Sequence, residues 1–206
     1  MELSIFLKLL VTFYPYFITN LVITNEFPQV ITKYKNIATY ISNEIYKRFR
    51  ADVQIFSDLE YLTSKKEGNV FVLGGPESNE LTHDILKNFR AMQWSNSTIT
   101  VGPCTFSTAN EIGTLFLAPY NNNLAFVVSA ASVLLFEDLV QILPIHPPYN
   151  AFPDYVVFNT KRGTNGAAAI LSAGYWSSSW EYERESAYVN CAKASLTNGR
   201  GVDPLW

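Results

Sequence analysis

Few residues in this sequence could do catalytic chemistry. His83 and His146 are the only histidines, and Cys104 and Cys191 are the only cysteines. Most enzymatic nucleophiles need a base beside a thiol or hydroxyl, and histidine is the commonest base. Asp84 follows His83 on a predicted helix, where adjacent side chains point in different directions and make a poor pair. The spacing of these residues therefore predicts no catalytic pair.

No serine or cysteine has the setting of a nucleophile. The nucleophile elbow reads G-x-S-x-G, and this pentapeptide does not occur in the sequence. Ser172, in LSAGYW, lies within a predicted strand and lacks the glycine that must precede an elbow serine. Cys104, in GPCTF, would be a nucleophile only beside a histidine, and a buried thiol or a disulfide partner fits it better. We predict no catalytic residue.

The cysteines also limit what the chain can bind. They lie far apart and form no C-x-x-C, which excludes a zinc site with four cysteine ligands. The two form one disulfide in a secreted protein or remain two buried thiols. No D-x-D or H-E-x-x-H spacing predicts a metal, and no motif predicts a cofactor. Asn96-Ser97-Thr98 is a glycosylation sequon, which has an effect only in the secretory pathway.

One stretch has the form of a ligand site. Residues 68–89 read GNVFVLGGPESNELTHDILKNF, an apolar run followed by a glycine turn and a helical pattern. Free backbone N–H groups at such a turn, together with the helix dipole, suit an anion. However, GGPESN matches neither G-x-G-x-x-G nor G-x-x-x-x-G-K-[ST], and Pro76 removes one donor. The stretch is a tight turn before a capped helix or a site for an anion or sugar. The residues of that site would be Gly74, Gly75, Glu77, Ser78 and Asn79.

Two further groups of side chains are candidates for binding. Open sheets collect ligands at the carboxyl ends of their strands, and several acidic residues lie near predicted strand ends. These are Asp52, Asp58, Glu60, Glu77 and Asp154, of which Glu77 is the best placed. Four aromatic residues near the last predicted strand could stack on sugar or peptide, or belong to the core. They are Tyr175, Trp176, Trp180 and Tyr182.

The first half of the chain predicts strands that alternate with helices. We expect strands at 20–24, 52–57 and 70–73, and a polar connection after residue 57. The last of these is a continuous apolar run, typical of a strand that is buried on both faces. A helical spacing of three or four predicts one apolar stripe, formed by Ile31, Tyr34, Ile37, Ala38, Ile41, Ile45 and Phe49. Ser78 or Asn79 should cap a second helix, and the pattern implies at least one βαβ crossover.

The second half predicts more antiparallel structure. The runs 114–118 and 124–130 flank PYNNN, and because asparagine tolerates positive φ we expect a tight hairpin there. A helix over 132–143, strands over 154–159 and 167–176, and a turn over 161–165 complete the elements.

These elements predict an α/β fold. We expect a layered sheet with a parallel, Rossmann- or flavodoxin-like N-terminal part and a more antiparallel C-terminal part. Residues 1–19 would be an apolar leader or packing segment, 20–182 a single α/β domain, and 183–206 a polar C-terminal tail. The first segment has no basic n-region or A-x-A-like cleavage site, and Lys8 and Pro15 interrupt its apolar run. We therefore do not expect a membrane span.

Composition excludes one class of partner. The chain of 206 residues has a formal net charge of -3 and no basic block, so it carries no electrostatic footprint for nucleic acid. Hydrophobic residues make up 48% and charged residues only 16%, which favours a sizeable core and some apolar surface that a partner covers.

Five stretches in this order resemble the C-terminal region of secreted prolyl oligopeptidase-like serine hydrolases of fungi and bacteria. They are RFRADVQIFSD (48–58), NVFVLGGPESN (69–79), GTLFLAPYNNNLAFVVSA (113–130), PDYVVFN (153–159) and AAAILSAGYWSSSWEY (167–182). In that family an α/β-hydrolase domain with the catalytic serine precedes this region. No position of this chain matches the catalytic motif, so the resemblance assigns no catalytic residue.

The resemblance implies an accessory, non-catalytic C-terminal module, or a truncated fragment, of a secreted peptidase-like serine hydrolase. Its partner would be an upstream α/β-hydrolase domain or another protein surface. The protein would be located in the secretory pathway or outside the cell, and the cytoplasm is the alternative location. The alternative function is a stand-alone domain that binds a small anion or sugar at the Gly74–Asn79 turn. A small enzyme that combines His83 or His146 with Cys104 is the third hypothesis, and no spacing supports it.

Overall fold

The computed structural model describes most of the chain in eight segments. These are residues 18–24, 28–64, 66–95, 98–107, 112–130, 152–159, 169–191 and 195–196, with the single residues 136, 139, 140, 143 and 145. Several predictions therefore concern residues outside the described part. They are the leader up to residue 17, the Asn96 sequon, His146, the turn over 161–165 and most of the helix over 132–143.

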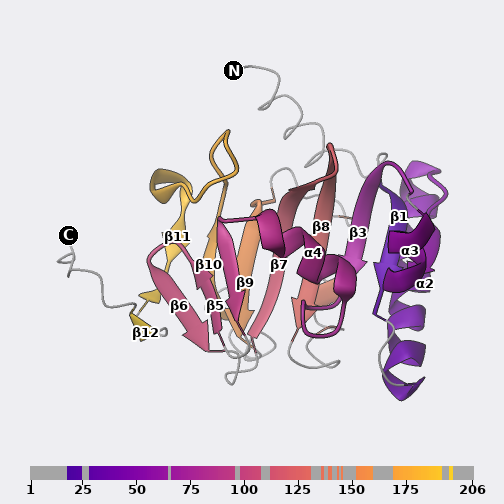
Figure 1. Cartoon of the computed structure of the whole chain (residues 1–206), viewed down its shortest axis with the longest axis horizontal. Helices are drawn as coiled ribbons and strands as arrows, with labels where there is room; N and C mark the ends of the chain where they lie inside the picture. Colours follow the sequence, from indigo (N-terminus) through magenta and orange to yellow (C-terminus); the bar gives the residue numbers. More distant parts are fainter. Residues whose placement is uncertain are drawn as a thin grey trace.

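Among the described residues, eight strands form the larger of two sheets (Figure 1). In spatial order they are β11 (Tyr188–Val189), β10 (Ile170–Gly174), β9 (Tyr155–Asn159), β7 (Ile112–Tyr120), β8 (Asn123–Ala130), β3 (Asn69–Leu73), β1 (Ile18–Ile23) and β2 (Gln54–Ser57). The pairs β8–β3, β3–β1 and β1–β2 are parallel. All pairs from β8 to β11 are antiparallel. The sheet is therefore mixed, and β8 lies where the two halves meet.

A second, smaller sheet lies in front of the first in the view of Figure 1. Its strands are β12 (Ser195–Leu196), β6 (Cys104–Ser107), β5 (Thr98–Val101) and β4 (Met92–Ser95), in that order and all antiparallel. Their residues alternate between buried and more exposed positions. This period of two is that of strands with one face on a core.

Three α-helices lie in the described residues. Helix α2 (Pro28–Phe49) connects the parallel neighbours β1 and β2, so the predicted βαβ unit is confirmed. Helix α3 (Asp58–Ser64) follows β2 directly, and α4 (Glu80–Asn88) follows the glycine turn after β3. A short 3-10 helix, η4 (Arg184–Ser186), precedes β11.

Both faces of the larger sheet are buried, and each has its own cover. One face packs against the predicted apolar stripe of α2, in which Ile37, Ile41 and Ile45 are buried. The other face packs against α3, α4 and the inner side of the small sheet, which supplies Ile99, Phe106 and others. The continuous apolar run of β3 fits this double burial.

The predicted α/β fold class is wrong. In the part of the chain that the structure describes, more residues lie in strands than in helices, and a mixed eight-stranded sheet with a four-stranded companion replaces the expected Rossmann- or flavodoxin-like layers. The prediction fails mainly at residues 92–107, which form β4, β5 and β6 and for which no element was predicted from the sequence. An apolar strand shows that both sheet faces need covering, but it does not say whether a helix or a second sheet covers them.

Other element predictions have mixed outcomes. The strands over 20–24, 52–57, 70–73, 154–159 and 167–176 are confirmed, the last in shorter form as β10. The polar connection after residue 57 is wrong, because α3 begins at Asp58. Strands β11 and β12 lie beyond residue 182, so the predicted boundary of the tail does not coincide with the end of either sheet.

The predicted hairpin between β7 and β8 is confirmed. The connection consists of Asn121 and Asn122, both with positive φ (47° and 62°), since Tyr120 already pairs with Asn123. Two consecutive residues with positive φ match the twist of antiparallel strands, and asparagine adopts this conformation more readily than most residues. Pro119 is tolerated inside β7 because β9 pairs only as far as Phe116.

The two cysteines form a disulfide, which resolves the alternative that the sequence left open. Cys104 in β6 is bonded to Cys191, just after β11, and both lie against the core beneath the small sheet. The bond therefore connects the small sheet to the edge of the larger one.

Tyr155 and Trp176 fill the core between the sheets near this edge. Their rings stack with centroids 4.2 Å apart. The indole Nε1 of Trp176 donates to the Leu117 carbonyl at 2.8 Å, and its backbone N–H donates to the Asp154 carboxylate at 2.9 Å. Trp176 is thus a core residue and not part of an exposed stacking cluster.

Loss of the disulfide should destabilise the fold. We expect Cys191→Ser to lower the free energy of unfolding by about 2 to 4 kcal/mol, because the unfolded chain is no longer held in a closed loop. Urea denaturation with and without dithiothreitol measures this. The reductant should destabilise the natural protein by a similar amount and leave the variant unchanged. A natural protein that is indifferent to reductant would contradict the pairing.

Stability should fall at alkaline pH because of buried tyrosines. Burial raises the pKa of Tyr155 to about 12. Burial and the nearby Asp84 carboxylate raise the pKa of Tyr120 to about 12 as well. An unfolded tyrosine loses its proton near pH 10, so the folded state binds more protons and the free energy of unfolding falls from about pH 10 to 12. Urea titrations across this range should show a shallower fall for Tyr155→Phe, and equal slopes would contradict it.

Candidate functional site

The predicted ligand site lies at the carboxyl ends of the parallel strands. The Gly74–Asn79 turn follows β3, Thr24 follows β1 and Asp58 follows β2. The structure brings the five predicted residues together in one turn, and Thr24 joins them through a hydrogen bond from its hydroxyl to the Ser78 carbonyl. This is the edge where an open sheet would bind a ligand.

The turn uses most of its own N–H groups. The Gly74 N–H donates to the Val128 carbonyl at 2.9 Å. The N–H groups of Ser78 and Asn79 donate to the Gly75 carbonyl at 3.1 and 2.9 Å. Of the amides in this turn, those of Gly75 and Glu77 have no acceptor among the described residues. Pro76 has no amide hydrogen to offer.

Asn79 caps helix α4 and is itself buried. Its side-chain oxygen accepts from the N–H groups of Leu81 and Thr82 at 3.0 and 3.1 Å, and its amide nitrogen donates to the Leu73 carbonyl at 3.2 Å. An N-cap residue of this kind satisfies amides that would otherwise be free at a helix start. The helix start is therefore closed to a ligand by the chain's own side chain.

Asp58 supplies the anion that the helix dipole favours. Its side chain is buried, and one carboxylate oxygen accepts from the Leu59 N–H at 2.9 Å while the other accepts from the Glu80 N–H at 3.0 Å. The carboxylate thus lies at the start of both α3 and α4, where negative charge is stabilised. An external phosphate would have to displace it.

The glycines of the turn serve close packing. Gly74 has φ +130°, a conformation that side chains disfavour, and a Cβ there would lie 3.1 Å from the Cβ of Asn79. At Gly75 a Cβ would lie 2.7 Å from the Ser129 hydroxyl of β8. The geometry therefore agrees with the first interpretation of this stretch, a tight turn before a capped helix.

Asp58, which lies beside this turn, has a role in holding helix starts that was not predicted from the sequence. The signal was present as Ser57-Asp58-Leu59-Glu60, which has the S-x-x-E form of a capping box. In the structure the Glu60 N–H donates to the Ser57 hydroxyl at 3.3 Å, and the Ser57 N–H donates to the Glu60 carboxylate at 3.4 Å. That motif predicts a helix start at Asp58.

The other candidates are not brought together. His83 lies on the exposed side of α4, and its side chain has no hydrogen-bond or ion-pair partner among the described residues. Cys104 is held in the disulfide, so it has no free thiol for the third hypothesis. Glu77 is exposed in the turn, whereas Ser172 is buried in β10. No group of three metal-ligating side chains occurs in the described segments.

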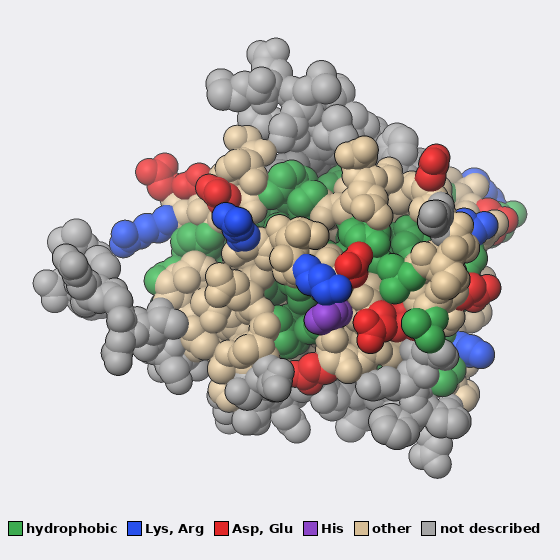
Figure 2. All heavy atoms as spheres, viewed as in Figure 1, with side chains coloured by type: hydrophobic (Ala, Val, Ile, Leu, Met, Phe, Trp, Pro, Cys, Tyr) green, Lys and Arg blue, Asp and Glu red, His purple; other side chains and the backbone are tan. Residues whose placement is uncertain are grey.

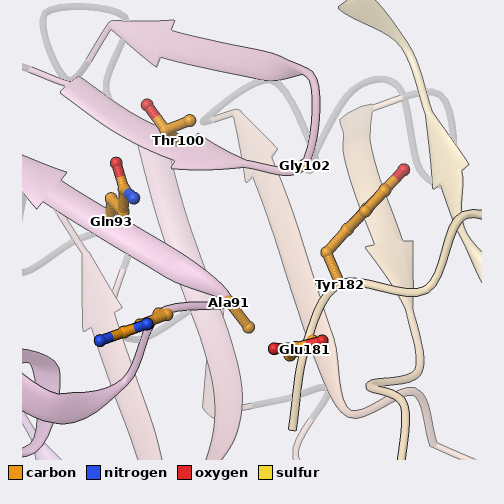
Figure 3. A pocket seen from close by; sticks show the side chains of 7 residues that line it. Ala91, Gln93, Thr100, Gly102, Glu181 and Tyr182 are labelled. Atoms are coloured by element: carbon orange, nitrogen blue, oxygen red, sulfur yellow. The ribbon is translucent and has the colours of Figure 1, made fainter. Parts of the chain in front are cut away.

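A cleft of about 370 Å³ lies elsewhere, between the small sheet and the segment that follows Trp176 (Figure 3). Gln93 of β4 and Thr100 of β5 form one wall, and Glu181 and Tyr182 form the other. The remaining lining residues are Arg90, Ala91 and Gly102. Of this set, only Tyr182 was among the candidates predicted from the sequence.

Tyr182 fixes the second wall of the cleft. Its ring packs directly on Gly102, at the β5–β6 turn, where φ is +55° and a side chain would collide with the ring. Residues 176–182 form a tight loop, in which Trp176 bridges to Tyr182 and the Ser177 hydroxyl accepts from the Glu181 N–H at 3.1 Å. Burial raises the pKa of the Tyr182 hydroxyl, so this side chain stays neutral at physiological pH.

None of the helices in the described segments combines the length and the apolar character that a membrane-spanning helix requires.

Removal of the Asn79 cap should destabilise the protein. We expect Asn79→Ala to lower the free energy of unfolding by about 2 kcal/mol, because two helix amides lose their acceptor and the Leu73 carbonyl loses its donor. The neighbouring Ser78→Ala is the matched control and should cost about 1 kcal/mol or less, because the Ser78 hydroxyl makes one hydrogen bond, to the Gly75 carbonyl at 3.3 Å. Urea denaturation distinguishes the two, and equal effects would contradict the capping role.

Comparison with known proteins adds no relative of this chain. No protein-family model matches the sequence, and no match came from the curated proteins or from the solved structures. The resemblance to prolyl oligopeptidase-like hydrolases therefore stays a prediction that depends on the five sequence stretches.

Proposed function

We propose that this chain is a non-catalytic module that acts beside a serine hydrolase of the prolyl oligopeptidase-like class. The hydrolase part of the proposal comes from the order of the five sequence stretches between residues 48 and 182. The partner would be an α/β-hydrolase domain that carries the G-x-S-x-G nucleophile.

One observation carries the non-catalytic part of the proposal. The polar groups at the carboxyl ends of the parallel strands, where an open sheet would bind a substrate, are engaged in holding two helices. Asp58 joins the starts of α3 and α4, and Asn79 caps α4 from a buried position. A catalytic site needs polar groups that are free to meet a substrate, and these two are not.

The disulfide supports the proposed place of action. Disulfides persist in secreted proteins and are rare where thiols are kept reduced. Cys104 and Cys191 are joined across 87 positions of sequence, and the described chain has no free cysteine. We therefore propose the secretory pathway or the cell exterior as its location.

The isolated chain should not hydrolyse serine-hydrolase substrates. We expect no turnover of a p-nitrophenyl ester or an aminoacyl p-nitroanilide, and no labelling of the chain by a fluorophosphonate probe, since the probe needs an activated serine. A chain precipitated from its native source should bring down a second protein that the probe labels.

Two results would contradict the proposal. Turnover that the fluorophosphonate abolishes would show that the chain has its own nucleophile. If no probe-reactive protein co-precipitates with the chain from its native source, the proposed hydrolase partner is contradicted.

A further inference from the structure

The outer side of the small sheet carries an array of short, uncharged polar side chains. Strands β4, β5 and β6 turn their apolar residues, such as Ile99 and Phe106, toward the core. Because side chains alternate along a strand, the intervening residues point outward. We call this set the hydroxyl face, and it consists of Gln93, Ser95, Thr98, Thr100, Thr105 and Ser107.

The strand register places these residues in two straight rows. Gln93 pairs with Thr100, which pairs with Thr105. Ser95 pairs with Thr98, which pairs with Ser107. Neighbours within a row are about 4.8 Å apart, and the two rows are about 6.7 Å apart along the strands. The result is a regular array on a firm backbone.

The hydroxyl face carries no charge in any of its described strands. Figure 2 shows the area over β5 and β6 in tan, with the red and blue side chains lying mainly around it. An anionic ligand would find no cation there, and nucleic acid binding needs several. Large apolar anchors, which dominate protein interfaces, are also absent from this set of residues.

Four of the five hydroxyl groups of this face pair with one another and still have capacity for a ligand. The hydroxyls of Ser95 and Thr98 lie 2.6 Å apart, and those of Thr100 and Thr105 lie 3.0 Å apart. Each hydroxyl has one donor and two acceptor positions, so one such bond leaves the others open. A partner that itself carries many hydroxyls, each both donor and acceptor, matches this surface.

The cleft of Figure 3 continues the hydroxyl face at one end. Gln93 and Thr100 belong to both, and the opposite wall adds an aromatic ring from Tyr182 and a carboxylate from Glu181. Arg90 also lines the cleft, and neither charged side chain has an ion-pair partner among the described residues. One charge of each sign gives strong hydrogen-bond partners for neutral hydroxyls without favouring an ion.

We propose that the hydroxyl face and its adjoining cleft bind a neutral polysaccharide. The polysaccharide would lie along the rows of serine and threonine side chains, and one of its sugar units would enter the cleft between Gln93 and Tyr182. This inference does not depend on the hydrolase partner proposed above, since the site lies wholly within this chain.

Affinity electrophoresis and pull-down test the proposal. The full chain is run in native gels that contain laminarin or mannan, and is mixed with insoluble cellulose or chitin. We expect retardation or retention on at least one of these four. The double variant Gln93→Ala/Thr100→Val should weaken it about tenfold, because two hydrogen-bonding groups are lost. Thr39→Val, on the exposed side of α2, is the matched control and should bind like the natural protein.

Further variants distinguish a loss of binding from a loss of folding. If the double variant melts at a lower temperature, Glu181→Gln and Arg90→Ala replace it, because both side chains are exposed and should be removable without unfolding. The proposal is overturned if none of the four polymers binds, or if binding persists equally in all cleft variants. The proposal is also overturned if the protein binds only an acidic polymer such as polygalacturonate and high salt abolishes that binding. The hydrolase assays above are unaffected by any of these results.

Discussion

The larger sheet buries both of its faces, and the rest of the structure follows from the need to cover them. The central strands β3 and β8 are apolar on both sides, so either face left open to water would expose a large apolar area. One face receives the long amphipathic helix α2, whose apolar stripe lies in one buried cluster with residues of the parallel strands β1 and β3. The other receives α3, α4 and a small second sheet, side by side. Strands therefore cover part of the antiparallel half of the main sheet, whereas helices cover both sheet faces in a doubly wound protein.

The same arrangement decides the use of polar groups at the carboxyl ends of the parallel strands. Two short helices start close together there, and each brings unpaired N–H groups that must not be buried without an acceptor. Asp58 and Asn79 meet this need from within the chain. A phosphate-binding protein with a similar strand–turn–helix unit leaves those amides for the ligand.

Much of the N-terminal half follows from sequence patterns, and part of the rest could have been found. The stripe of α2, the run of β3 and the Asn121–Asn122 turn are local signals, because helical period, continuous apolar character and positive φ are fixed within a few residues. Helix α3 could have been predicted from the capping box that begins at Ser57, and β5 from the alternation of polar and apolar residues over Thr98–Val101. The fold class was wrong for a different reason: which element covers a sheet face depends on contacts between distant segments. Likewise the cleft joins residues 90–102 to residues 181–182, and no local pattern connects them.

The covalent link between Cys104 and Cys191 has a consequence for any protease that the protein meets. The two cysteines are 87 positions apart in sequence, and strands β7 to β11 lie between them. A single cut in a loop anywhere inside that span leaves both pieces attached through sulfur, and the strands on either side still pair. Nicked molecules would therefore keep their size and shape, and the damage would become visible only after reduction.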